Sequence, residues 1–430
     1  MSTPVAGPAR PSVRFVVPKG LGYASGGTVY NTRLAEALTG LGIAVEVVGV
    51  PGAWPVGTPE DRARLAAALA VRLVPQRRPA HDAAPTPPLS AHARLATVGS
   101  SPGPVPVGRT RPDPTLASGV TVDGILVDSL LGLGAPEEIR VAACAAGQAG
   151  TVVGLLVHMS LADASGLPAP EAARLAALER EALAAAPVVL VPSEFAARRL
   201  AERYGRPPHV ARPGVVRVPE AVGSFTVGAP PHILCLAALL PGKGQLRLVH
   251  ALAAVRDRPW TATLAGYDGA DPAYARSLRD TVAKLALAER VRVPGELRGD
   301  ALEAEWARTD LTVLASESET FGLAVAESLA RGIPAVVAGG TGAVEALGLS
   351  LVGGLGPAGA VAGPAGDGQQ GLGDPLAREL AGWLDEAAVR ARWRAAALAA
   401  RPLLPGWEAT GRAVLLALSG QRDAPAASGA

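Results

Sequence analysis

The stretch from Asp310 to Glu345 constrains the fold more than any other part of this sequence. It begins with an apolar run of strand length, 311–315, and after a polar loop it shows helical spacing from Gly322 to Arg331. A Gly-Ile-Pro sequence at 332–334 ends the helix, and a second apolar run starts at Ala335. The order strand, loop, helix, strand is the building block of a parallel sheet.

Within that helix, Glu327 has apolar neighbours at helical spacing, Leu323, Ala324 and Ala330. Its only partner on the helix is Arg331, four positions later. Such a pair contributes a few tenths of a kcal/mol, far less than the cost of burying a carboxylate without better partners. If Glu327 is buried, a group outside the helix must satisfy it.

A second acid, Glu319, stands where the loop turns into the helix. Four backbone amides without helical partners follow it: those of Thr320, Phe321, Gly322 and Leu323. Such a helix start favours an anion, typically phosphate, whereas the two carboxylates would accept hydrogen bonds from hydroxyls. The pair Glu319 and Glu327 therefore predicts a ligand with phosphate and polyol parts. The alternative is a helix-start acid at Glu319 and a surface pair between Glu327 and Arg331.

The spacing Glu319-x7-Glu327, within S-E-T-F-G-L-A-V-A-E-S-L-A-R-G-I-P-A-V-V-A, closely resembles the signature of retaining glycosyltransferases of family 4. Members of that family have the two-domain GT-B fold. The resemblance implies that Glu319 contacts the donor sugar and that Glu327 holds the nucleotide ribose. It also implies that amides near Phe321, Gly322 and Leu323 meet the distal phosphate and the sugar.

The length of 430 residues and an apolar fraction of 49% favour two domains, each with its own core. We expect a first domain at 1–217 with a Pro/Ala-rich insertion at about 74–117, a linker at 218–230, a second domain at 231–404, a helix at 405–418 that crosses back to the first domain, and a disordered tail at 419–430. Within the second domain, Gly353 to Gly373 reads as a flexible loop.

The net charge of +2 does not indicate nucleic-acid binding, which needs a concentrated basic surface. The N-terminus lacks the apolar core of a signal peptide. The uncharged stretch from Val141 to Ala162 is interrupted by glycines, so it is expected to form a helix end, a turn and a strand at Thr151 to His158. We therefore expect a cytoplasmic protein without a transmembrane segment, for which peripheral membrane contact remains allowed.

In the first half of the chain, Gly26 and Gly27 stand at a helix start and allow close approach of a ligand to the backbone. The tighter G-x-G-x-x-G turn of dinucleotide-binding proteins is absent, which disfavours an oxidoreductase. The resemblance implies that the two glycines face the cleft between the domains. Tyr30, Asn31 and Arg33 follow on the first turns of the helix and are further candidates for cleft contacts, although solvated positions are the expectation for them.

His158 ends a predicted strand with the sequence L-V-H-M-S. Ligands of open parallel sheets bind at the carboxyl edge of the strands, so this histidine is a candidate catalytic residue. The stretch is similar to the family's strand that ends in a histidine reaching the donor sugar.

Only three of the 40 basic residues are lysines, and Lys243 lies between two glycines after a strand and before a helix. Its position and charge suit a pyrophosphate. The stretch resembles the family's G-R-L-x-P-x-K-G but departs from it, because Ala237 and Ala238 stand where the family has Gly and Arg. Three residues are candidates to supply the missing cation: Arg212, Arg33 and Lys19.

The sequence thus predicts an α/β protein of GT-B type, with two Rossmann-like domains whose parallel sheets face each other across a cleft. The predicted reaction transfers a sugar from a nucleoside diphosphate sugar to an unidentified acceptor, with retention of the anomeric configuration. No metal-binding spacing is present and no cofactor is expected, so Lys243 and the helix amides should stabilise the departing diphosphate. Two alternatives remain open: another GT-B activity such as an epimerase or phosphorylase, and a non-catalytic sugar-nucleotide binding subunit, suggested by Ala238.

Overall fold

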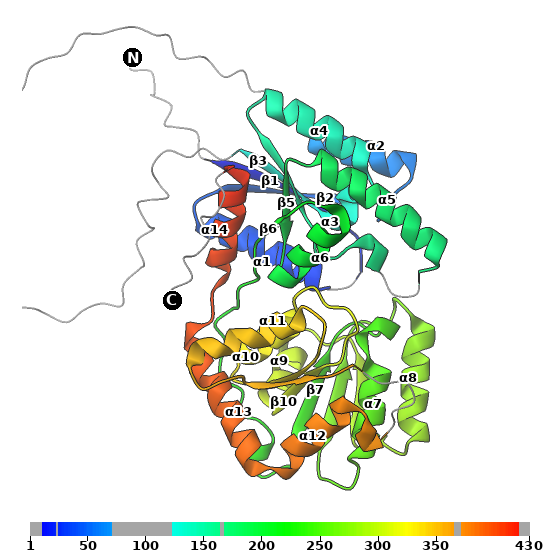
Figure 1. Ribbon diagram of the computed structural model, residues 1–430, viewed down its shortest axis with the longest axis vertical. Helices are drawn as coiled ribbons and strands as arrows, with labels where there is room; N and C mark the ends of the chain where they lie inside the picture. The colour runs from blue at the N-terminus through cyan, green and yellow to red at the C-terminus, as the bar shows by residue number, and fades with distance from the viewer. Residues whose placement is uncertain (1–10, 23–24, 71–122, 164–166, 365–370, 421–430) are drawn as a thin grey trace, which may run out of the picture.

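The computed structural model describes residues 11–22, 25–70, 123–163, 167–364 and 371–420. It contains two α/β domains, each built on a six-stranded parallel sheet (Figure 1). The predicted fold class, two Rossmann-like domains with parallel sheets, is confirmed. The insertion predicted at about 74–117 and the last ten residues of the predicted tail lie outside the described residues.

The sheet of the first domain has the strand order β2-β1-β3-β4-β5-β6. Its strands are β1 (Ser12–Lys19), β2 (Ala44–Pro51), β3 (Gly124–Asp128), β4 (Val152–Leu156), β5 (Val188–Val191) and β6 (His209–Val210). The helices of this domain are α1 (Gly26–Gly40), α2 (Pro59–Leu69), α3 (Ser129–Gly132), α4 (Pro136–Gln148), α5 (Ala169–Ala185) and α6 (Glu194–Tyr204).

The sheet of the second domain has the order β12-β11-β10-β7-β8-β9. Its strands are β7 (His232–Leu236), β8 (Thr261–Ala265), β9 (Val291–Gly295), β10 (Leu311–Leu314), β11 (Ala335–Ala338) and β12 (Gly359–Ala362). Its helices are α7 (Gln245–Ala254), α8 (Pro272–Lys284), α9 (Gly299–Ala307), α10 (Leu323–Ala330), α11 (Ala343–Gly348), α12 (Pro375–Asp385) and α13 (Ala387–Ala400).

Several inner strands of the two sheets are buried along their whole length because helices cover both faces. Every residue of β3, β5, β10 and β11 is buried. Parallel sheets require such two-sided cover, since their crossover helices lie on the faces. Among the described residues, no helix combines the length and apolar character that crossing a bilayer requires.

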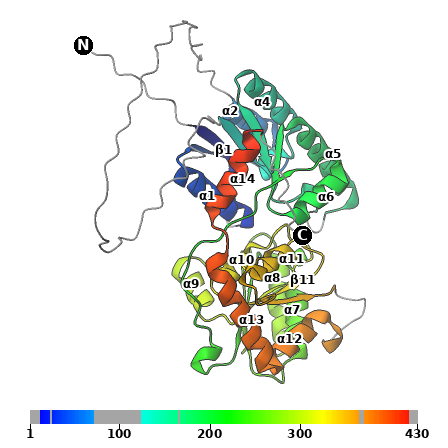
Figure 2. The same cartoon turned by 60° about the vertical axis from the view of Figure 1, so that its left-hand side comes forward.

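The last helix, α14 (Trp407–Leu418), returns to the first domain, where it lies beside α1 (Figure 2). Val414 and Leu418 are fully buried there in a cluster with Leu34 of α1. The chain passes between the domains twice, and the two passages lie side by side. The amide of Val215 donates to the carbonyl of Pro405 at 2.8 Å.

The loop predicted at Gly353 to Gly373 contains a strand that the sequence did not reveal. Its residues Gly359–Ala362 form β12, which pairs in parallel with β11 at the edge of the second sheet. The strand begins with Gly359, a residue type that suggests a loop in the sequence. A glycine is required there because an added Cβ would lie 1.7 Å from the carbonyl oxygen of Ala335. The close approach of the two backbones requires a residue type that normally marks a loop.

A buried charged cluster ties β7 and β8 to α9 in the second domain. The carboxylate of Glu305 accepts from His232 Nε2 at 2.7 Å and from Arg308 Nη2 at 2.8 Å. The other ring nitrogen of His232 lies 2.7 Å from the hydroxyl of Thr261. Burial disfavours the charged carboxylate, but these hydrogen bonds outweigh that cost and lower the pKa of Glu305 to about 2.

We expect Glu305→Gln to lower the free energy of unfolding at pH 7 by about 3 kcal/mol, because it removes one partner of a buried ion pair. Since the pKa of Glu305 is lower in the folded chain, its contribution is complete above the ordinary value of 4.5 and is lost as the pH falls toward 2. Urea unfolding at pH 7 and pH 3 should therefore show that the free energies of unfolding of variant and parent differ less at pH 3 than at pH 7. The control is Glu289→Gln at an exposed position, and equal differences at both pH values would contradict the prediction.

Candidate functional site

The start of α10 presents backbone amides that no side chain caps. Gly322 is the N-cap residue and has a φ of +90°, a conformation that favours glycine. It has no side chain that could accept a hydrogen bond from the first amides of the helix. A Cβ at this position would lie 3.1 Å from Cα and Cβ of Ala343, so α11 also leaves no room for one. Phe321 is only 2% exposed and anchors the turn in the core of the second domain. The amides of Phe321, Gly322 and Leu323 thus mark a helix start suited to an anion.

Lys243 and Glu319 meet beside this helix start, with Nζ 2.7 Å from Oε1. Their loops follow β7 and β10, which are neighbours in the sheet. The loops also touch through Gly244, where φ is +70° and an added Cβ would lie 2.1 Å from the carbonyl oxygen of Ala315. The structure therefore brings together a cation and a carboxylate that the sequence predicted separately, and the two partly neutralise each other.

Glu327 lies in the middle of α10 and is partly buried. Its carboxylate makes no hydrogen bond or ion pair with any residue that the structure describes. Arg331 instead pairs with Glu303 at 2.8 Å and donates to the backbone carbonyl of Glu327. Burial raises the pKa of Glu327, while the charges of Arg331 and Arg33 partly oppose the shift. The alternative interpretation, a surface pair of Glu327 with Arg331, is wrong.

In the first domain, His158 belongs to a buried polar group at the carboxyl ends of β3 and β4. Its Nε2 atom lies 2.8 Å from Asn31 Oδ1 and 3.3 Å from Asp128 Oδ2. Asn31 in turn donates through Nδ2 to Asp128 Oδ2. Burial disfavours the charged Asp128, but His158, Asn31 and the amide of Leu130 outweigh it and lower the pKa of Asp128.

The expectation of solvated positions for Tyr30 and Asn31 is wrong. Asn31 is 6% exposed within the His158 group, and Tyr30 is buried with its hydroxyl donating to the carbonyl of Ala211 at 2.7 Å. Sequence reasoning also missed the role of Asp128 in this group. The signal was present, because Asp128, like His158, follows an apolar strand of a parallel sheet.

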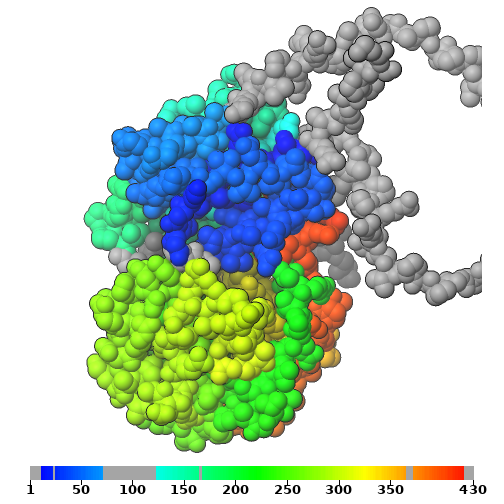
Figure 3. Space-filling view, turned by 180° about the vertical axis from the view of Figure 1, so that it is seen from behind, coloured from blue at the N-terminus to red at the C-terminus, as the bar shows by residue number. Residues whose placement is uncertain are grey.

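Gly26 and Gly27 connect the two halves of the site. A Cβ at Gly27 would lie 3.1 Å from the His158 ring, and one at Gly26 would lie 3.5 Å from Leu323 of α10. The first turns of α1 and α10 therefore face each other across the domain boundary. Seen from behind, the start of the described chain (dark blue) borders the second domain (Figure 3). Arg298 Nη2 of the second domain lies 3.5 Å from the carbonyl oxygen of Gly22, which follows β1.

None of the three candidates for the cation that Ala238 lacks forms an ion pair with Glu319 or Glu327 among the described residues. Arg212 pairs with Glu345 at 2.5 Å and with Glu194 at 3.2 Å. Arg33 pairs with Glu36 on its own helix at 2.9 Å. Lys19 is exposed, with its aliphatic stem against Gly49 of β2. Among the described residues, Lys243 is the basic residue that forms an ion pair with Glu319.

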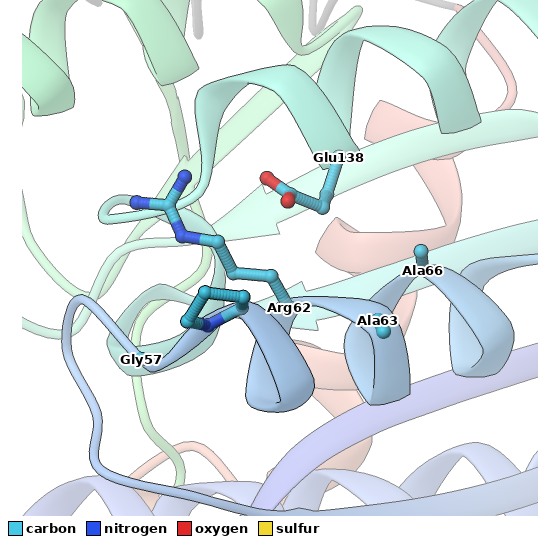
Figure 4. Close-up of a pocket in the computed structure, with 6 residues that line it drawn as sticks. Gly57, Arg62, Ala63, Ala66 and Glu138 are labelled. Carbon is cyan, nitrogen blue, oxygen red and sulfur yellow. The ribbon is translucent and has the colours of Figure 1, made fainter.

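A hollow of ≈ 530 Å³ lies away from this site, on the outer surface of α2 and α4 (Figure 4). It is lined by Gly57, Pro59, Arg62, Ala63, Ala66 and Glu138. The guanidinium of Arg62 donates to the carbonyls of Val56 and Gly134, so its role there is to fasten the loop before α2 to the start of α4.

The site thus combines an uncapped helix start, a lysine paired with Glu319, and the carboxylate of Glu327, which no described residue pairs with. The facing domain adds a histidine held by Asp128 and Asn31. The helix start and Lys243 can hold a diphosphate. The carboxylates can accept hydrogen bonds from sugar hydroxyls.

Comparison with known proteins agrees with this chemistry. Residues 224–357 match the family model of glycosyl transferases group 1. A GDP-mannose-dependent alpha-(1-6)-phosphatidylinositol monomannoside mannosyltransferase of Mycobacterium tuberculosis is 28% identical over 176 residues. That match covers 37% of this chain and 45% of the relative, so the chain corresponds to less than half of the curated protein that it matches.

The structural neighbours extend over both domains. A glycosyltransferase from Rickettsia africae superposes with a TM-score of 0.62 at 15% identity, covering 96% of this chain and 98% of the other. HepE of Anabaena in complex with UDP and glucose superposes with a TM-score of 0.62 at 17% identity, covering 95% and 99%. These likenesses show that the chain has the fold of GT-B glycosyltransferases.

Proposed function

We propose that this protein is a retaining glycosyltransferase of family 4 that transfers a sugar from a nucleoside diphosphate sugar to an acceptor. The observation that carries the proposal is Glu327, a partly buried carboxylate without a hydrogen-bond or ion-pair partner among the described residues, one turn into a helix whose start is uncapped. Partial burial disfavours the charged form of this carboxylate, and a ligand that supplies hydroxyl donors would offset that cost.

In this proposal the second domain binds the donor. Lys243 and the amides of Phe321, Gly322 and Leu323 hold the diphosphate, and Glu327 accepts hydrogen bonds from the ribose. Glu319, which Lys243 pairs with at 2.7 Å in the absence of ligand, contacts the transferred sugar. Support comes from the relatives, since the mycobacterial protein is named for its dependence on GDP-mannose and HepE was solved with UDP.

The first domain contributes His158 and the backbone around Gly26 and Gly27. Because His158 Nε2 faces Asn31 and Asp128, the Nδ1 side of the ring is the side with which it would meet the donor sugar. Departure of the diphosphate is assisted by Lys243 and the dipole of α10, which stabilise the charge that develops on the leaving group. We propose a cytoplasmic location for this reaction.

A thermal-shift screen tests the donor assignment directly. The screen uses UDP, GDP, ADP, UDP-glucose, GDP-mannose and ADP-glucose. At least one of them should raise the melting temperature, because a ligand that binds only the folded state stabilises it by about 2.7 kcal/mol at 100 times its dissociation constant. If none of the six ligands shifts the melting temperature at millimolar concentration, the donor assignment is wrong. Retention is tested separately by NMR of the anomeric configuration of the product.

A second candidate function is a sugar-nucleotide binding subunit without catalysis. Ala238 favours it, because the arginine of the family motif is absent, Arg212 and Arg33 pair with other acids, and Lys19 is exposed. This candidate predicts binding of the same nucleotide without transfer to any acceptor in a broad panel. Turnover of the donor with one acceptor would exclude it, and conversion of the donor without an acceptor would point to an epimerase or hydrolase.

A further inference from the structure

Glu345 of α11 makes three hydrogen bonds to the first domain. Its Oε1 atom lies 2.5 Å from Nε of Arg212, and its two oxygens accept from the amides of Glu194 and Phe195 at 3.2 and 3.1 Å. Both amides belong to the first turn of α6, where unpaired donors and the helix dipole favour an anion. The second domain therefore supplies a carboxylate that the first domain binds.

A second contact joins the same helix to the loop of the proposed donor site. Ser193, the N-cap of α6, accepts from the amide of Ala196 at 2.9 Å and donates its hydroxyl to the carbonyl of Thr320. Thr320 stands between Glu319 and Phe321. The first domain thus holds the backbone immediately next to the residues assigned to the donor.

Within the second domain, α11 is attached to that loop. The amide of Gly342, just before α11, donates to the carbonyl of Glu319 at 2.7 Å. A Cβ on Gly342 would lie 2.2 Å from the carbonyl oxygen of Thr320, so the two backbones are in direct contact. Movement of α11 relative to α6 would consequently displace the loop from Glu319 to Gly322.

The contact lies next to the place where the chain passes between the domains. The carbonyl of Arg212 accepts from the hydroxyl of Thr410 at 2.6 Å, while the Arg212 side chain reaches Glu345. Arg212 is therefore held by α14 on one side and by the second domain on the other. Domains joined by a limited interface move relative to one another by default, so a few charged contacts can decide the preferred arrangement.

We propose that Glu345 is a positioning residue, whose contacts with Arg212 and the start of α6 hold the two domains closed and thereby fix the loop from Glu319 to Gly322. The part that concerns the loop's ligand rests on the proposed function, whereas the part that concerns closure does not. Losing several charge-assisted hydrogen bonds across the boundary should shift the population toward an open arrangement and weaken nucleotide binding about tenfold.

The distance between two spin labels measures closure in the full chain without any ligand. The native Cys144 is exposed on α4, and Ser277→Cys adds an exposed site on α8 of the other domain. Cys235 is buried, and burial raises the pKa of its thiol to about 12, so it should not be labelled. We expect the distances between the two labels in Glu345→Ala and Arg212→Gln to extend to longer values than in the parent. The control Glu408→Ala, at an exposed position on α14, should give the same label distances as the parent.

The affinity of each variant for UDP and GDP is measured by calorimetry on the same proteins. If the parent binds neither nucleotide, the proposed donor is wrong, and the label distances alone decide whether Glu345 closes the domains. Distance distributions of both Glu345→Ala and Arg212→Gln that coincide with the parent overturn the proposal. Circular dichroism melts establish that the variants fold, and the milder Arg212→Gln keeps the test available if Glu345→Ala does not.

Discussion

Replacing Lys243 with methionine should weaken binding of UDP or GDP, whichever the parent binds, by about 100-fold. The lysine Nζ lies beside the uncapped start of α10, and within the described residues Glu319 is its ion-pair partner. A charge-assisted contact to a phosphate oxygen contributes about 1.5–3 kcal/mol, and each 1.4 kcal/mol corresponds to tenfold in affinity. Calorimetry with the nucleotide, and with inorganic pyrophosphate alone, measures the effect. The affinity for both ligands should fall, because the lysine is assigned to the diphosphate that they share.

Lys284→Met provides the matched control for this variant. Lys284 is another of the three lysines, it lies in the last turn of α8, and it is exposed. The control should bind both ligands as the parent does. If Lys243→Met retains the parent's affinity for pyrophosphate, the phosphate-binding assignment of this loop is wrong, whatever the sugar specificity of the protein.

The parallel architecture could be predicted because it depends on local patterns. Apolar runs such as the one that forms β10 alternate with helical spacing along the whole chain, and only a sheet covered on both faces accommodates such strands. β12 could not be predicted in this way. Its glycine is required by the close approach of Ala335, a contact with a residue 24 positions earlier in the sequence.

The second-domain part of the site was also visible in the sequence, since Glu319 to Glu327 and Lys243 form short motifs. The first-domain part was visible only in fragments. Asn31 was expected in solvent, although it lies between His158 and Asp128, residues 127 and 97 positions away from it. Partners so distant in sequence are set by the order of the strands, which a motif does not contain. The same holds for Arg212, whose partner Glu345 belongs to the other domain.

Replacing Glu327 with glutamine should have two effects of opposite sign. Nucleotide affinity should fall about tenfold, because the amide keeps only one oxygen to accept hydrogen bonds from the two ribose hydroxyls. Affinity for inorganic pyrophosphate should stay at the parent's value, which separates this variant from Lys243→Met. Calorimetry with both ligands makes the comparison, and a loss of pyrophosphate binding would contradict the assignment of Glu327 to the ribose.

Without ligand, Glu327→Gln should be more stable than the parent at pH 7, with a melting temperature higher by about 2–4 °C for a gain of about 1 kcal/mol. Burial raises the pKa of Glu327, so the folded chain binds the proton more tightly than the unfolded chain. The stability of the parent therefore falls as the pH rises from the ordinary value of 4.5 through the raised pKa of the folded chain. The glutamine variant avoids that cost, and its advantage should disappear as the pH falls below the ordinary value of 4.5. Glu408→Gln, at an exposed position on α14, should show neither effect.

The combination of higher stability and weaker binding distinguishes a binding residue from a structural one. A carboxylate that stabilises the fold would lower the melting temperature when it is neutralised, as expected for Glu305 with its partners His232 and Arg308. A carboxylate that binds a ligand has no partner in the free protein, and the free-energy cost of burying its charge is offset only in the complex. A lower melting temperature for Glu327→Gln at pH 7 would therefore show that Glu327 has a partner within the protein and that its place in the donor site is wrong.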